Sequence, residues 1–172
     1  ISTIAKRLEL LYRAAERNKF RRQDGSQVSK FVYLDMEEYR DMWLTAEVFM
    51  HTLDRPGLER VRAGIALQAY VPDSYLVQQQ ITQWARRRVE AGRSPITMRI
   101  VKGANMEMER VEASQRGWPQ APYRSKLETD ANYKRMVIYG LQPENIQAAW
   151  LGIASHNLFC LLYTSPSPRD RG

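Results

Sequence analysis

The feature that most constrains the fold is a unit that recurs along the chain, a short apolar run followed by a stretch with helical periodicity. Apolar runs typical of buried strands begin near residues 31, 65, 96 and 146. These starts lie 34, 31 and 50 residues apart, and strand and crossover-helix units of about 30 residues produce a parallel sheet. The pattern predicts an α/β fold and leaves two architectures open, a doubly wound open sheet and a (β/α)8 barrel.

Periodicity and turn signals together predict the order of elements. An amphipathic helix with apolar positions from Ile4 to Ala15 comes first, and the aperiodic stretch KFRRQDGSQVS, residues 19–29, is predicted to be a loop. Ser74 is the expected N-cap of one helix, and Thr129 or Asp130 that of another. The expected strands span 31–36, 65–71, 96–103 and 146–156, and the later helices span 37–54, 74–92, 105–117 and 130–140.

Polar residues lie toward the carboxyl ends of the predicted strands. They are Asp35, Gln68, Arg99 with Lys102, and His156. A buried strand carries such groups only when they have partners, since each unpaired one costs several kcal/mol. Their common position predicts a ring of ligand-binding side chains, as at the carboxyl face of a barrel. The alternative for Arg99 is a structural ion pair, for example with Asp35. Lys102, Gly103 and Ala104 together suit a phosphate group.

Composition excludes several classes of protein. The single cysteine, Cys160, excludes an internal disulfide and a zinc site of paired thiols, and we expect no metal site. No apolar stretch is long enough to span a membrane, so we expect a cytoplasmic protein. The net charge of +7 permits a polyanionic partner. The arginines at 86–88, however, fit the solvated face of an amphipathic helix, so we expect no nucleic acid partner.

Six ordered strings resemble the flavin-dependent proline dehydrogenase family, with the closest likeness to the bifunctional enzymes that also carry a glutamate semialdehyde dehydrogenase. The strings are FVYLDMEEYRD, GIALQAYVPDS, MRIVKGANMEMERVEA, GWPQAPY, TDANYKRM and ASHNLF. The resemblance implies a distorted (β/α)8 barrel, of which this chain supplies about strands 3 to 6 with their helices. It also implies oxidation of L-proline to 1-pyrroline-5-carboxylate by hydride transfer to FAD, with a quinone as electron acceptor and attachment to the inner membrane surface as an alternative location.

Site residues follow from the same resemblance. Asp35 and Arg99 match the family's active-site aspartate and arginine, and Arg99 is expected near the flavin N5 atom. Asn105 and Met106 stand where several relatives carry aromatic residues. Seven positions match residues that contact FAD: Met36, Gln68, Lys102, Gly103, Ala104, Ser155 and His156.

The chain lacks parts that the family uses to bind the proline carboxylate, a lysine on an earlier strand and an arginine pair on the last barrel helix. Residues 1–159 are therefore expected to form a partial barrel that is inactive by itself. Residues 160–172, CLLYTSPSPRDRG, resemble translated adapter sequence and are expected to be a non-native, disordered tail. The alternatives are a flavin-linked barrel enzyme of the methylenetetrahydrofolate reductase type and a non-enzymatic basic binding module.

Overall fold

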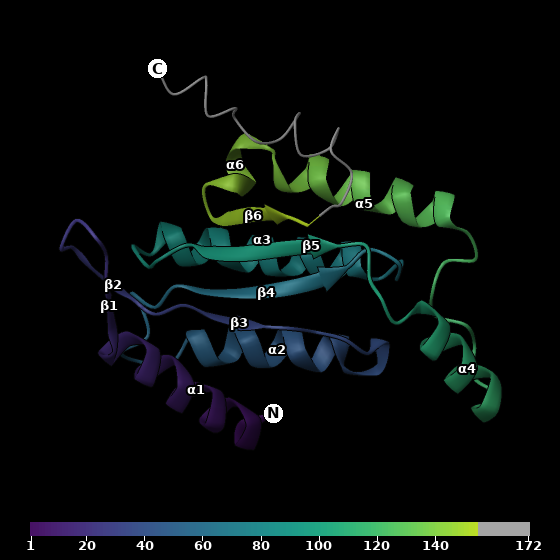
Figure 1. Ribbon diagram of the computed structural model, residues 1–172, viewed down its shortest axis with the longest axis horizontal. Helices are drawn as coiled ribbons and strands as arrows, with labels where there is room; N and C mark the ends of the chain where they lie inside the picture. The colour runs from purple at the N-terminus through teal and green to yellow at the C-terminus, as the bar shows by residue number, and fades with distance from the viewer. Residues whose placement is uncertain (155–172) are drawn as a thin grey trace.

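A parallel sheet of four strands organises the molecule. The structure, a computed structural model, describes residues 1–154, and the strand order is β3-β4-β5-β6 (Figure 1). Helices occupy the connections between successive strands, as an α/β fold requires. The described strands form an open arc, which is part of a (β/α)8 barrel, so the predicted fold class is confirmed. The strands are Val32–Leu34, Ala63–Gln68, Ile96–Val101 and Ala149–Ile153.

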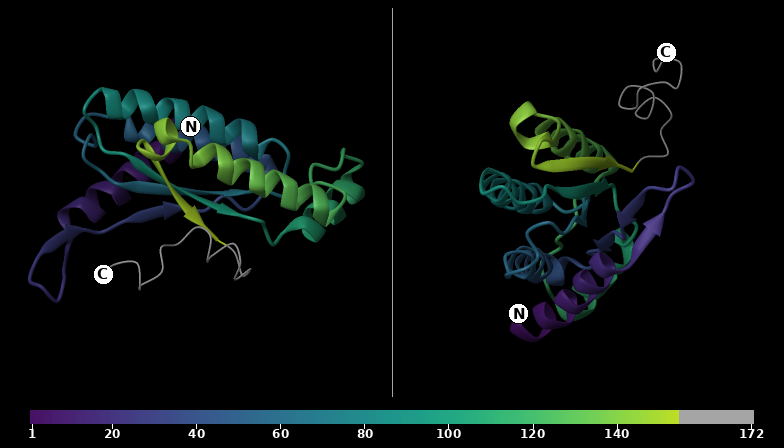
Figure 2. Two further views of the ribbon diagram at one scale, coloured as in Figure 1. Left: turned by 90° about the horizontal axis from the view of Figure 1, so that it is seen from above. Right: turned by 90° about the vertical axis from the view of Figure 1, so that its left-hand side faces the viewer.

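The sheet has an outer face covered by helices and an inner face that is less buried. Helices α2 (Met42–Leu53), α3 (Ser74–Glu90) and α5 (Lys126–Gly140) lie along the outer face (Figure 2). Burial alternates along β5, where Ile96, Met98 and Ile100 are buried and the residues between them are only partly so. The short helix α6 (Pro143–Ile146) leads into β6. No helix within residues 1–154 is long and apolar enough to cross a membrane.

The prediction of a loop at residues 19–29 is wrong, because this stretch forms a β-hairpin. It follows helix α1 (Ser2–Arg17) and consists of β1 (Lys19–Arg21) and β2 (Gln27–Ser29), which pair antiparallel. Gly25 has a φ of 83°, and the Ser26 amide donates to the Asp24 carboxylate at 2.8 Å. The positive φ of Gly25 and the hydrogen bond to Asp24 are typical of an Asp-Gly turn. The strands are too short to show a period, so the sequence pattern did not reveal them.

Two helix starts also differ from expectation. Helix α5 begins at Lys126, where Ser125 and Glu128 form a reciprocal capping box. This places Thr129 and Asp130 inside the helix instead of at its cap. Ser74 is the first residue of α3 and not its N-cap, and its hydroxyl donates to the Gln68 carbonyl at 2.6 Å.

Arg88 lies inside the molecule, although the arginines at 86–88 were all expected on a solvated face. Its side chain is 3% exposed, whereas Arg86 and Arg87 are exposed. The guanidinium donates to the carbonyls of Leu53, Leu58, Glu59 and Ser94 at 2.6 to 3.1 Å. It therefore ties the end of α2 and the following loop to α3, and burial lowers its pKa.

Replacing Arg88 by methionine is expected to destabilise the protein strongly. The substitution leaves four carbonyls without their donor, and we expect the free energy of unfolding to fall by about 3 to 5 kcal/mol. Arg87→Met on the exposed face of the same helix is the control, with an expected change within about 0.5 kcal/mol. Urea unfolding of the purified protein measures both changes. Equal effects of the two substitutions would contradict the structural role of Arg88.

Candidate active site

An ion pair between Arg99 and Asp35 lies on the inner face of the sheet. In register, Arg99 of β5 has Ala66 of β4 on one side and Gly152 of β6 on the other. Because these neighbours are small, the Arg99 side chain can cross β4, and its Nη2 donates to Asp35 Oδ1 at 2.7 Å. The side chains are 41% and 55% exposed, so the pair contributes little to stability and remains accessible to a ligand. The two residues predicted to be catalytic are thus in contact.

Tyr33 supports the Arg99 side chain, a role that the sequence analysis missed. Arg99 Cζ lies 5.5 Å from the centroid of the Tyr33 ring, within the range of a cation–π interaction. The ring covers Gly64, where a Cβ atom would lie 2.3 Å from Tyr33 Cε1. Burial raises the pKa of Tyr33, which keeps the phenol neutral. The signal that could have revealed this contact is a glycine inside a buried strand, which often marks a close approach.

Gln68 ends β4 and holds the main chain that follows Asp35. Its Nε2 donates to the Met36 carbonyl at 2.5 Å and to the Glu37 carbonyl at 3.3 Å. The Met36 side chain is itself buried in the core, so this residue meets Gln68 through its carbonyl. Within residues 1–154, the buried Oε1 of Gln68 and the buried Nε of Arg99 have no hydrogen-bond partner. Such unpaired buried groups are costly, and they mark places where a ligand can supply the missing partners.

Gly103 makes room for the side chains beside it. Its φ is 110°, in the region that favours glycine. A Cβ atom here would lie 1.9 Å from Tyr70 Cδ1 and 2.9 Å from Gln68 Oε1. The glycine therefore allows the strand-to-helix turn to approach the acceptor atom of Gln68 closely.

Lys102 already has a partner. Its Nζ lies 2.5 Å from Asp130 Oδ1 and 5.7 Å from the centroid of the Tyr133 ring. The pattern of the sequence indicates a helix cap at Asp130, whereas this residue lies inside α5 and pairs with Lys102. Both ends of the ion pair are partly exposed, so the ammonium is fixed in place but still accessible. Ala104 is exposed.

The remaining predicted site residues, Ser155 and His156, lie outside the described residues. Within residues 1–154, no group of histidine, cysteine, aspartate and glutamate side chains could hold a metal ion. The site consists of an arginine, a carboxylate and an amide on the inner face, with a glycine turn and a paired lysine beside them. This arrangement suits an anionic ligand that can also form hydrogen bonds.

Comparison with known proteins identifies the family. The model of the proline dehydrogenase family matches residues 2–166. Proline Utilization A (PutA) from Corynebacterium freiburgense is 44% identical with a TM-score of 0.80, and the match covers 91% of this chain and 15% of that one. PutA from Bdellovibrio bacteriovorus, described as inactivated by N-propargylglycine, is 36% identical with a TM-score of 0.78, and the match covers 93% and 15%.

A third solved relative is described as a bifunctional proline utilization A (PutA) protein. It is 28% identical with a TM-score of 0.62, and the match covers 73% of this chain and 12% of that one. No curated protein matches the chain at a significant level. The chain spans 15% of the length of each of the two more similar relatives. From the family match over 2–166 and these identities, the chain belongs to the proline dehydrogenase family.

Proposed function

We propose that this chain forms part of the flavin site of an enzyme that oxidises L-proline to 1-pyrroline-5-carboxylate. The observation that carries the proposal is the contact between Arg99 and Asp35 on the inner face, beside the unpaired Oε1 of Gln68. It joins an accessible cation to a free hydrogen-bond acceptor within a chain of the proline dehydrogenase family.

The residues on the inner face fit FAD. A flavin ring carries hydrogen-bond donors and acceptors along one edge, which matches the unpaired acceptor of Gln68 and the unpaired donor of Arg99. Gly103 lets the strand-to-helix turn pack closely against Tyr70 and Gln68, and Lys102 would supply a positive charge for the phosphate portion. Met36, Gly103 and Ala104 would border the cofactor, and Ser155 and His156 remain proposed contacts beyond the described residues.

Proline oxidation removes one hydride and one proton. The C–H bond next to nitrogen breaks, the nitrogen loses its proton, and a carbon–nitrogen double bond forms. Bound FAD supplies the acceptor for the hydride. Arg99 stabilises the negative charge that accumulates on the acceptor side, and Asp35 orients the guanidinium. The Tyr33 ring lies against the Arg99 guanidinium and limits its movement.

One further observation supports the substrate. The Bdellovibrio bacteriovorus relative is inactivated by N-propargylglycine, which is a secondary α-amino acid, as proline is. Proline also carries a carboxylate, and both cations of the site, Arg99 and Lys102, are already paired with carboxylates and assigned to the flavin. We therefore expect the lysine and the arginine pair of the intact enzyme to bind that group, and we expect residues 1–172 alone to be inactive.

The length of the relatives supports the presence of a second catalytic domain in the intact protein. Because the chain spans 15% of two of them, the intact protein has room for a glutamate semialdehyde dehydrogenase domain, as the bifunctional relative suggests. The electrons would pass from the reduced flavin to a quinone. The proposed foreign tail, 160–172, lies outside the described residues, and the family match ends within it at residue 166. The genomic reading frame around this segment would test both the proposed tail and the proposed further domain.

Steady-state assays test the proposed function. With L-proline and a dye as artificial electron acceptor, the full-length gene product is expected to reduce the dye. The 1-pyrroline-5-carboxylate that forms should be detectable by its reaction with an aromatic aldehyde. Residues 1–172 with added FAD are expected to give no turnover. Turnover of the short chain near that of the long one would contradict the need for the missing residues. A full-length protein that does not oxidise proline but oxidises a reduced folate would favour the alternative, a barrel enzyme of the methylenetetrahydrofolate reductase type.

A further inference from the structure

Helix α4 (Met106–Arg116) is attached to the rest of the molecule mainly through polar contacts. Ala113 is its only buried residue, whereas Met108 and Val111 are exposed. A pocket of about 300 Å³ lies between this helix, the loop that contains Trp118, and Tyr39 with Arg40. Since little apolar surface is buried, the position of α4 depends on a few side-chain hydrogen bonds and ion pairs.

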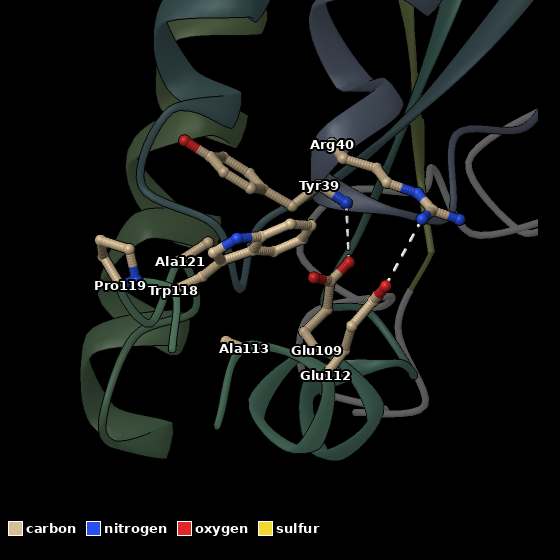
Figure 3. Close-up of a pocket in the computed structure, with 8 residues that line it drawn as sticks. All are labelled: Tyr39, Arg40, Glu109, Glu112, Ala113, Trp118, Pro119 and Ala121. Carbon is tan, nitrogen blue, oxygen red and sulfur yellow. Dashed lines mark hydrogen bonds and ion pairs between the residues drawn. The ribbon is translucent and has the colours of Figure 1, made fainter. Parts of the chain in front are cut away.

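The strongest of these contacts joins Glu109 to the main chain of Tyr39. The Tyr39 amide donates to Glu109 Oε1 at 2.7 Å, and Figure 3 shows the Glu109 and Glu112 side chains pointing from α4 toward Tyr39 and Arg40. A hydrogen bond to a carboxylate at this distance is about twice as strong as a neutral one. The contact between Arg40 and Glu112 is longer, 3.4 Å, and its arginine is half exposed, so it contributes less.

Tyr39 lies at the end of the segment that follows Asp35. Its hydroxyl donates to Asp73 Oδ2 at 3.0 Å, which ties the ring to the start of α3. At the other end of the segment, Gln68 binds the carbonyls of residues 36 and 37. Residues 36–39 are therefore held at both ends, by β4 on one side and by α3 and α4 on the other.

The Asp35–Arg99 pair does not hold this segment by itself. Both of its side chains are about half exposed, and exposed ion pairs contribute between zero and about 1 kcal/mol. Asp35 is placed instead from both sides along the chain, by the pairing of Leu34 with Ile65 before it and by the hydrogen bonds of residues 36–39 after it. Within residues 1–154, α4 and its N-cap reach this segment through two groups: Glu109 accepts from the Tyr39 amide at 2.7 Å, and Asn105 donates to the Glu37 carbonyl at 3.4 Å. The contact of Glu109 is the shorter one and the one that involves a charge.

We propose that Glu109 is a positioning residue, which fixes the segment 36–39 through the Tyr39 amide and so places Asp35 against Arg99. A lost hydrogen bond at Tyr39 would let the segment move and would release the guanidinium from its orientation. Small misplacements of catalytic groups can slow a reaction by about 100-fold. The catalytic part of this inference rests on the proposed function, whereas the placement of the segment does not.

Amide hydrogen exchange tests the placement in the full-length protein stripped of flavin. We expect Glu109→Ala to raise the exchange rate of residues 36–41 at least about tenfold, because the Tyr39 amide loses its acceptor. Glu109→Gln keeps an acceptor oxygen and should restore most of the protection. Glu107→Ala is the matched control, since its side chain is 83% exposed on the same helix and pairs only with Arg110 within the described residues. Unchanged exchange in Glu109→Ala would overturn the proposal.

Flavin reduction tests the catalytic consequence. We expect Glu109→Ala to lower the rate of reduction by saturating proline about tenfold, with little loss of bound FAD. In an Asp35→Asn background, the same substitution should have almost no further effect on that rate, because both act through one group. If the double variant loses as much rate as the two single substitutions predict together, the proposal is overturned. It is also overturned if the reduction rate and the FAD content fall in parallel in Glu109→Ala and Glu109→Gln restores neither. If proline does not reduce the flavin of the unaltered protein, the proposed function is wrong. The hydrogen-exchange experiment still decides whether Glu109 fixes residues 36–39.

Discussion

Replacing Arg99 by methionine in the full-length protein is expected to slow flavin reduction by proline about 100- to 1,000-fold, since one preorganised donor to a developing charge contributes that much. Methionine has a similar length and no charge, and the neighbours of Arg99 in register are small, so the strand can accept it. FAD retention should fall much less, because Gln68 and the Lys102–Gly103 turn remain. Rapid mixing with proline under anaerobic conditions measures the rate, and flavin content after gel filtration measures retention.

Arg93→Met is a suitable control for Arg99→Met. Arg93 lies beyond the end of α3, and its one ion pair within the described residues, to Asp54 at 3.4 Å, is long. This control should leave the reduction rate unchanged. Equal losses of rate and of bound FAD in Arg99→Met would show that Arg99 has only a structural role.

Gly103→Ala is expected to damage both stability and cofactor binding. Strain at a φ of 110° and the contact of the new Cβ with the Tyr70 ring should together lower the free energy of unfolding by about 3 kcal/mol. The Tyr70 ring is buried, so it can move only with its surroundings, and Gln68 would move with it. We therefore expect the purified protein to retain little FAD.

Gly92→Ala separates backbone strain from steric contact. Gly92 has a φ of 74°, but nothing lies within 4 Å of a Cβ built there. Its substitution should lower the free energy of unfolding by about 1 kcal/mol and leave FAD content unchanged. Urea unfolding and flavin absorbance measure both variants. Similar results for Gly92→Ala and Gly103→Ala would contradict a special role for Gly103 at the site.

The strands and their polar ends could be predicted from sequence because both follow from periodicity. The predicted start of β5 at Ile96 is confirmed, and the predicted strand at 65–71 corresponds to β4 at Ala63–Gln68. Asp35, Gln68 and Arg99 converge because parallel strands place their carboxyl ends at one edge of the sheet. The roles of these residues toward FAD and proline remain proposals.

Contacts between distant segments could not be predicted in this way. The Tyr33 ring over Gly64 and the bond from the Tyr39 amide to Glu109 depend on register and helix orientation, which one sequence does not show. The pairing of Lys102 with Asp130 was missed for a local reason, the overlooked capping box at Ser125. The resemblance to the family predicts which residues form the site, and the structure shows what holds the described ones in place.

Anaerobic mixing of the full-length protein with L-proline shows whether proline reduces the bound flavin. We expect proline to bleach the oxidised flavin absorbance completely in the unaltered protein, and to bleach it far more slowly in Arg99→Met that still holds FAD. A flavin that stays oxidised in proline but is reduced by dithionite would show that the protein does not oxidise proline.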